Sequence, residues 1–301
     1  SVVMKILITD SERGAFLWKD GEALRPLPCP AECPYCPAAS RERLFLCCRK
    51  NRDCWCLSRR TLQTERVFPA PPALAAACPS PCGKYLYLLS TEADAVQTVS
   101  LETGELCYAA PAGVFPRSMK LHPSGRLLLC AGGAVNEACL LNAPGLTLRH
   151  VFYPKNPCFG ADFWREGVVL LCAVEGENLQ TAVCLGRPGR PRTREIQRLP
   201  GQPGALCVCS DGVNALLSTP DGLMKLSLPG GELEWNLPEW ALCMGLCCQG
   251  GMALVSDALC GRVCLLDLRR PWENRILFQG TDAQACFLPE EHNSSPSGAN
   301  S

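Results

Sequence analysis

The sequence predicts an all-β fold, a seven-bladed β-propeller with four-stranded blades. Three observations predict it: an apolar run recurs at nearly constant intervals, each interval contains four short strand-like segments, and the two chain ends each hold only part of an interval. Four strands in each unit, repeated around a ring, are typical of propellers.

The recurring apolar run marks seven equivalent places. The steps between them are 38, 42, 41, 42, 46 and 38 residues, which is the period of propeller blades or of helical arrays. A second apolar run follows each of them and alternates with period two in several units, which favours strands. The marked places are Thr9, Cys47, Leu89, Cys130, Cys172, Ser218 and Ser256.

Two further segments complete each unit. A third run ends in proline in six units, as expected for an outer edge strand, where a missing N–H does least harm. A segment of small residues precedes the marked run, which fits an inner strand crowded around an axis. The outer runs are 24–28, 66–69, 107–111, 150–154, 196–200 and 235–238, with 276–280 as the exception; inner segments include 73–78, 116–121, 158–163, 204–209 and 242–247.

The ends of the chain are expected to share one blade. Residues 5–28 supply three strands and residues 284–289 supply the fourth, which removes an open sheet edge. A single domain over 4–289 follows, and the polar residues 290–301 predict a disordered tail. The expected blades are 284–289 plus 4–28, 30–71, 72–112, 113–156, 157–203, 204–240 and 241–283.

Composition restricts the function classes. Lys plus Arg and Asp plus Glu number 29 each, so no net field attracts nucleic acid or an anionic membrane. The basic run 187–194 is expected to be an exposed, flexible loop rather than an anion site. No run of 18 apolar residues occurs and the first residues lack a signal-peptide layout. A cytoplasmic monomer without a cofactor is expected, with a protein or a small molecule as its partner.

The 23 cysteines are interpreted as small buried residues. Their number is odd, and the chain is long for a disulfide-rich secreted scaffold. Three of them occupy the strand-end position that Thr or Ser takes in other units, namely Cys47, Cys130 and Cys172 against Thr9, Ser218 and Ser256. Reduced, buried thiols are therefore expected.

Cys29, Cys33 and Cys36 allow a sharper alternative. Their C-x3-C-x2-C spacing is that with which radical S-adenosylmethionine enzymes hold a four-iron cluster, and Cys33-Pro-Tyr-Cys36 resembles the glutaredoxin tetrapeptide. Zinc would need a fourth thiolate from Cys47, Cys48, Cys54 or Cys56, at unusual spacing. The alignment of this segment with the inner strand at 72–79 argues against the first two, and the spacing of the second cysteine pair argues against zinc, so a metal site at these cysteines stays an alternative.

Two segments resemble the repeat of YVTN-type propellers. Ser80-Pro-Cys-Gly-Lys-Tyr-Leu-Tyr-Leu-Leu-Ser90 and His122-Pro-Ser-Gly-Arg-Leu-Leu-Leu129 are similar to its Ser-Pro-Asp-Gly-Lys-x-Leu-Tyr-Val-Thr-Asn unit. The catalytic branch of that family is lactonase-like, and its Gly-Pro-Arg-His segment is similar to Phe115-Pro-Arg-Ser118. The resemblance implies a ligand contact by Arg117. Ser118 replaces the family's histidine and Ala131-Gly-Gly133 replaces its Asn-Glu, so no pair for general-base catalysis is evident.

When the blades are aligned, the residues equivalent to Arg117 in the other six blades are Cys33, Ala75, Phe159, Gly204, Cys243 and Gln284. The candidate ligand-binding residues are therefore Arg117, Cys33 and Gln284 at the channel mouth, and no catalytic residue is assigned. Arg117 is alternatively expected to pair with a neighbour such as Asp162. Asp10 and Asp257 are expected to accept hydrogen bonds from the N–H groups of their own turns.

These observations favour a non-catalytic binding or scaffolding module. The first alternative is a lactonase-like hydrolase acting at the channel mouth, and the second is a cysteine-ligated metal or iron–sulfur protein.

Overall fold

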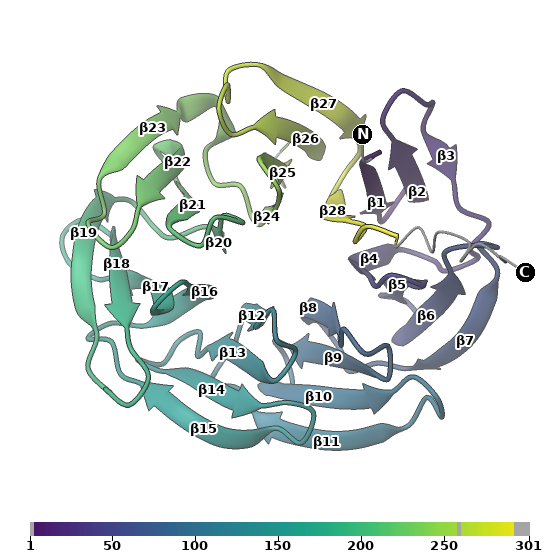
Figure 1. The fold of residues 1–301 in the computed structure, drawn as a ribbon, viewed down its shortest axis with the longest axis horizontal. Helices are drawn as coiled ribbons and strands as arrows, with labels where there is room; N and C mark the ends of the chain where they lie inside the picture. The colour runs from purple at the N-terminus through teal and green to yellow at the C-terminus, as the bar shows by residue number, and fades with distance from the viewer. Residues whose placement is uncertain (1–2, 258–259, 292–301) are drawn as a thin grey trace, which may run out of the picture.

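The computed structural model describes residues 3–257 and 260–291. Within them, seven four-stranded antiparallel sheets are arranged in a ring around a central axis (Figure 1). The predicted fold class is confirmed, including the sharing of one blade by the two ends of the chain. The sheet of the first blade has the strand order β28-β1-β2-β3.

The strands follow one another from the axis outward in every blade. The first three blades contain β28 (Gln284–Phe287), β1 (Lys5–Asp10), β2 (Gly14–Lys19) and β3 (Arg25–Pro26); β4 (Pro34–Ala39), β5 (Arg43–Cys48), β6 (Asp53–Ser58) and β7 (Thr64–Pro69); and β8 (Leu74–Pro79), β9 (Tyr85–Ser90), β10 (Ala95–Ser100) and β11 (Leu106–Pro111). The fourth and fifth contain β12 (Ser118–Leu121), β13 (Leu127–Ala131), β14 (Ala138–Asn142) and β15 (Thr147–Phe152); and β16 (Cys158–Trp164), β17 (Gly167–Val174), β18 (Gln180–Gly186) and β19 (Arg194–Pro200). The last two contain β20 (Leu206–Val208), β21 (Asn214–Thr219), β22 (Gly222–Ser227) and β23 (Leu233–Leu237); and, after a 3₁₀ turn at Pro238–Trp240, β24 (Gly245–Gln249), β25 (Met252–Asp257), β26 (Arg262–Asp267) and β27 (Asn274–Gln279).

The closure of the ring is an antiparallel pairing of β28 with β1. Thr9 lies opposite Gln284 and Ile6 lies opposite Phe287. The pairing continues past the strand end, because the N–H of Leu288 donates to the carbonyl of Lys5 at 2.9 Å. Glu291, which the sequence placed in a polar tail, forms ion pairs with Lys5 and Arg59. Residues 292–301 of the expected tail lie outside the described residues.

The core lies between the blades. Among the described residues, the buried apolar side chains form seven clusters, and each cluster draws its members from two adjacent blades. The second strand of a blade, counted outward from the axis, is buried on both faces because each face of its sheet packs against a neighbouring blade. In the third blade this strand is β9, which is buried at five of its six positions. This explains why the marked runs are continuously apolar instead of alternating.

The strand-end positions behave as the sequence analysis predicted. Cys130 and Cys172 are fully buried, as are Thr9 and Ser218 in other blades. Asp10 and Asp257 are buried and each accepts a hydrogen bond within its own turn, from Arg13 and Cys260 respectively. In the described part of the chain, no helix has the length and hydropathy needed to cross a membrane.

The basic run of the fifth blade connects β18 to β19. Residues 187–192 are exposed, and Arg187 pairs with Glu166 at 3.0 Å.

Candidate functional site

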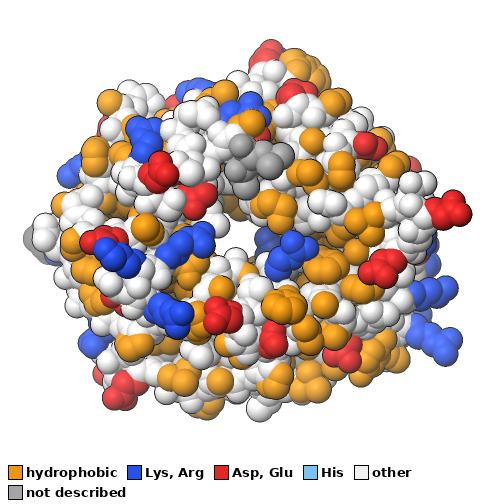
Figure 2. Space-filling view, turned by 180° about the vertical axis from the view of Figure 1, so that it is seen from behind, with side chains coloured by type: hydrophobic (Ala, Val, Ile, Leu, Met, Phe, Trp, Pro, Cys, Tyr) orange, Lys and Arg blue, Asp and Glu red, His pale blue; other side chains and the backbone are white. Residues whose placement is uncertain are grey.

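The central channel is walled by the innermost strand of each blade. Its larger part, about 430 Å³, is lined from β4, β8, β12, β24 and β28, and a smaller part of about 200 Å³ is lined from β12, β16 and β20. The two parts adjoin, since both are lined by Ala75, Met119, Lys120 and Met244. Figure 2 shows the opening from behind, with Lys and Arg side chains at its edge.

Arg117 lies in the segment that leads into β12. It lines the smaller part of the channel, and its guanidinium stacks 4.6 Å from the ring centroid of Phe159. Burial lowers the pKa of Arg117, yet a guanidinium stays charged at neutral pH. Arg117 has no ion pair with another described residue.

The expected pairing of Arg117 with Asp162 is wrong. Both oxygens of Asp162 accept backbone hydrogen bonds instead: Oδ1 from the N–H of Phe163 at 2.7 Å and Oδ2 from the N–H of Val208 at 2.8 Å. The second bond ties the inner strands of the fifth and sixth blades together. Asp162 is therefore a structural acceptor. Burial raises its pKa, while the charge of Lys120 and these hydrogen bonds act in the opposite direction.

Lys120 is the second cation in the channel and lines both of its parts. It forms no hydrogen bond or ion pair with another described residue. Burial acts to lower the pKa of Lys120, but the acidic groups around it, which are Cys207, Asp162, Cys247 and Cys78, outweigh burial and raise the pKa. Lys120 is thus a half-buried ammonium that stays protonated over the physiological range.

Arg49 is a third cation at the edge of the channel, in the turn between β5 and β6. Its guanidinium lies 4.1 Å from the ring centroid of Tyr35, and its Nη2 lies 3.9 Å from Oδ2 of Asp282. Asp282 also accepts a hydrogen bond from the N–H of Ser11 at 2.8 Å. Among the described residues that line the channel, three cations therefore face a single carboxylate, which already has two partners.

The other sequence-derived candidates differ in placement. Gln284 lines the larger part of the channel, where its Oε1 accepts a 2.6 Å hydrogen bond from the N–H of Cys36. Cys33 is exposed ahead of β4 and lines neither part of the channel, and its carbonyl accepts from the N–H of Arg49 at 3.3 Å. The structure thus brings Arg117 and Gln284 to one channel and leaves Cys33 outside it.

The three clustered cysteines lie in different surroundings. Cys36 is buried in β4 against the third blade, Cys33 is exposed, and Cys29 packs between the first and second blades. Across the described residues, no group of three or more His, Cys, Asp or Glu side chains could hold a metal ion. The spacing of these cysteines reflects a strand and the turn before it.

The positions that correspond to the lactonase-like residues are occupied by structural groups. Ser118 bridges β12 to β16, since its Oγ accepts from the N–H of Ala161 at 3.3 Å. Gly133 packs directly against the chain that leads to Arg117: a Cβ atom there would lie 2.2 Å from the carbonyl oxygen of Val114. Neither position carries a group that could activate water beside Arg117.

Lys120 and Arg49 were not predicted from the sequence. Lys120 carried a usable signal, because it is a lysine within an inner-strand segment made of small and apolar residues. Arg49 carried none, because it lies among other basic residues in a turn, and only the packing of blades around the axis brings that turn to the channel.

Comparisons with known proteins show the fold alone. No protein-family model matches the chain. No curated protein matches it either. Similar solved structures include a functionally unknown protein from Desulfotomaculum acetoxidans, with TM-score 0.70, 9% identity, and coverage of 96% of this chain and 99% of that one. A protein from Lactobacillus plantarum has TM-score 0.70, 12% identity, and coverage of 95% and 100%. Kuenenia stuttgartiensis hydrazine synthase has TM-score 0.67, 16% identity, and coverage of 79% and 77%.

Proposed function

We propose that the protein is a non-catalytic binding module whose central channel holds a small organic anion. The observation that carries the proposal is the pair of cations in the fourth blade, Arg117 and Lys120, which face the channel without an ion-pair partner among the described residues. Two such charges raise the local concentration of anions and bind carboxylate or phosphate groups through charge-assisted hydrogen bonds.

The walls around these cations favour a ligand with an apolar body. Ala76, Met119, Met244 and Leu246 line both parts of the channel. The larger part, about 430 Å³, lies within the range of small-molecule sites, which combine apolar walls with a few polar groups. A metabolite that bears a carboxylate or a phosphate on an aliphatic or aromatic body fits this arrangement.

A hydrolase is less well supported by the same residues. The similarity to lactonase-like propellers of YVTN type extends to Arg117 and to the turn at 122–125. At the position of that family's histidine, however, Ser118 accepts a hydrogen bond from the backbone of the next blade. The structural neighbours include an enzyme, hydrazine synthase, and a protein described as functionally unknown, so the fold does not decide between binding and catalysis.

Isothermal titration calorimetry with a panel of organic carboxylates and phosphate esters tests the proposal. The double variant R117M/K120M is expected to weaken binding at least about tenfold, because the anionic group loses two charge-assisted contacts. The matched control is K84M/R126M, which removes two exposed cations outside the channel. Equal affinity of the wild type and R117M/K120M, absence of binding by the whole panel, or hydrolysis of a sugar lactone that is lost in Arg117→Met would each contradict the proposal.

A further inference from the structure

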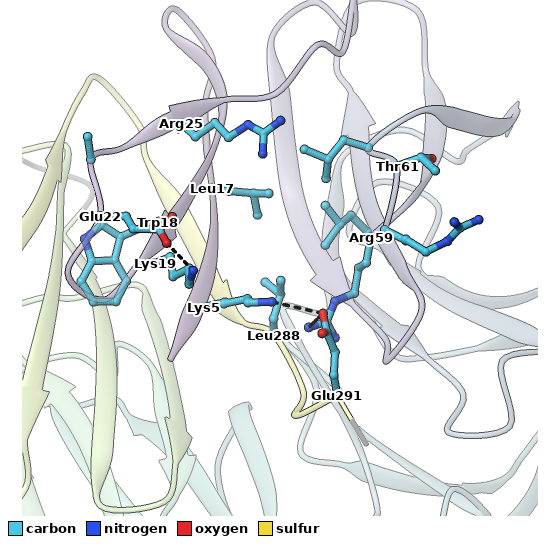
Figure 3. A pocket seen from close by; sticks show the side chains of 14 residues that line it. Lys5, Leu17, Trp18, Lys19, Glu22, Arg25, Arg59, Thr61, Leu288 and Glu291 are labelled. Atoms are coloured by element: carbon cyan, nitrogen blue, oxygen red, sulfur yellow. Dashed lines mark hydrogen bonds and ion pairs between the residues drawn. The ribbon is translucent and has the colours of Figure 1, made fainter. Parts of the chain in front are cut away.

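A second cavity lies between the first and second blades (Figure 3) and shares no lining residue with the channel. We refer to this cavity of about 270 Å³ as the interblade cleft, lined by Lys5, Leu17, Trp18, Lys19, Glu22, Ala23, Arg25, Leu44, Arg59, Arg60, Thr61, Leu62, Leu288 and Glu291. It opens where β3 is short: β3 pairs with β2 only at Phe16↔Pro26 and Leu17↔Arg25, whereas β7 covers β6 from Asp53 to Leu57.

The cleft has an excess of positive charge. Its lining contains five basic side chains and two acidic ones. Lys19 pairs with Glu22 within the first blade. Arg25 and Arg60 are exposed and form no hydrogen bond or ion pair through their side chains with another described residue. Figure 3 shows Arg25 extending from the first blade towards Thr61 of the second.

Arg59 is a buried cation at the inner end of the cleft. Its side chain is 4% exposed, and its Nη1 donates to the carbonyls of Ser40 at 2.9 Å and Pro289 at 2.8 Å. The Nε atom of Arg59 is buried without a hydrogen-bond partner. The charge of Arg59 is balanced by Glu291, whose Oε1 lies 3.2 Å from Nη2 and whose side chain is 54% exposed. Because Glu291 also pairs with Lys5, one exposed carboxylate faces two cations at this end of the cleft.

Glu291 shows that the cations of the cleft bind a carboxylate group. Its Oε1 is shared between Arg59 and Lys5, at 3.2 Å from each. Three residues earlier, Leu288 is 4% exposed and packs with Leu44 and Leu62. The chain's own segment 288–291 thus places an aliphatic side chain on the apolar floor and a carboxylate among the cations. Arg25, Arg60 and Leu17 line the space that this segment leaves unfilled.

We propose that the interblade cleft binds a short acidic peptide of a partner protein, in which an aliphatic side chain lies beside carboxylates. Arg25 and Arg60 bind the carboxylates, since guanidinium groups present paired N–H donors to them. The aliphatic side chain packs on Leu17. Glu291 acts as an internal competitor, because it holds Lys5 and Arg59, which would otherwise attract the same carboxylates.

Fluorescence anisotropy with a labelled synthetic peptide of sequence Glu-Leu-Pro-Glu-Glu tests the proposal on the full chain. Arg25→Gln combined with Arg60→Gln is expected to weaken binding at least about tenfold. The control R126Q/R149Q removes two exposed arginines of the fourth blade and is expected to leave affinity within about twofold. Glu291→Gln is expected to strengthen binding by about threefold, because Lys5 and Arg59 are released.

Two further peptides separate recognition from simple charge attraction. Replacing the leucine of the probe by alanine, or its glutamates by glutamines, is expected to abolish most of the binding. Equal affinity for the alanine peptide, or full competition by inorganic phosphate, would overturn the proposal in favour of a plain anion site. Equal affinity of the wild type and R25Q/R60Q, or no measurable binding to the wild type, would also overturn it. The channel variant R117M/K120M is expected to bind the peptide normally, so this test is independent of the channel ligand.

Discussion

The carboxylate of Asp10 joins the two ends of the ring: its Oδ1 accepts a 2.7 Å hydrogen bond from the backbone N–H of Thr281, which is 271 residues further along the chain. The same oxygen accepts from the N–H of Asp282 at 3.0 Å, and Oδ2 accepts from Arg13 at 2.9 Å. One buried side chain thus satisfies donors in the first turn of the chain and in the segment that leads into β28.

Asp10→Ala is expected to lower the free energy of unfolding by about 2–4 kcal/mol, because it leaves several partly buried N–H groups without an acceptor. Urea denaturation followed by circular dichroism measures the change. Asp20→Ala serves as the control, since the Asp20 side chain is 54% exposed and pairs at the surface with Arg275; its cost is expected to stay below about 1 kcal/mol. A cost for Asp10→Ala no larger than that of the control would refute the closing role of Asp10.

Gly133→Ala is expected to disturb the channel as well as stability. Gly133 has φ of +71°, and a Cβ atom there would lie 2.2 Å and 2.4 Å from the carbonyl oxygens of Val114 and Phe115. The chain leading to Arg117 would have to shift, so we expect a loss of at least about 3 kcal/mol and weaker anion binding. Gly189, with φ of +77° and open space around it, is the matched control, and its change to alanine should cost about 1 kcal/mol.

Alkaline pH is expected to lower the stability of the protein through its buried thiols. Burial raises the pKa of Cys243 and of Cys264 to about 12, from the ordinary value of 9.0. Between pH 9 and the folded-state pKa of about 12, these thiols are ionised in the unfolded state but stay protonated in the folded state. The stabilising contribution of the buried thiols is therefore complete below pH 9 and decreases as the pH rises through this window. Each thiol should cost roughly 1.4 kcal/mol per pH unit in this window.

The comparison that checks this is urea denaturation of Cys264→Ala and of the wild type, in reductant, at neutral and at alkaline pH. The free energy of unfolding of Cys264→Ala should decrease less between neutral and alkaline pH than that of the wild type. Cys107→Ala, at an exposed position, should show the same decrease as the wild type. Parallel pH profiles for all three proteins would show that thiol ionisation is not the cause.

Cys82 is expected to react faster than Cys107, another exposed thiol of the folded protein. It is exposed, and a side-chain hydrogen bond with Ser80, at 3.3 Å between oxygen and sulfur, lowers its pKa. A lower pKa supplies more thiolate at neutral pH. Stopped-flow labelling with a disulfide reagent should modify Cys82 before Cys107, and Ser80→Ala should slow Cys82 alone. Equal rates for the two cysteines in the wild type would contradict the prediction.

Much of the fold was predictable because the same sequence pattern occurs in all seven blades. Strands such as β9 and β13 follow tight turns and are buried on both faces, so their apolar runs stand out in each unit. The short β3 was not predicted: residues 24–28 resemble the outer runs of other blades, yet only Arg25 and Pro26 pair with β2. Its shortness opens the interblade cleft, which therefore had no signal in the sequence.

The candidate site was predictable only in part. Alignment of the blades located Arg117 and Gln284 at the channel, since equivalent positions of a repeat occupy equivalent places in a ring. The partners of these residues were not predictable. Whether Arg117 stacks on Phe159 or pairs with Asp162 depends on the orientation of neighbouring inner strands, and the N–H of Val208 in the sixth blade already occupies one of the two carboxylate oxygens.

The sequence by itself determined the all-β class, the seven repeats and the joining of the two ends, because these depend on local periodicity and on counting units. The tertiary structure decided which charges share a cavity. Lys120, Arg49 and Arg117 come from different turns and strands of two blades, and segment 288–291 reaches Arg59 only after the ring closes. Electrostatic interactions depend on distances in space, and a repeat pattern along the chain does not contain those distances.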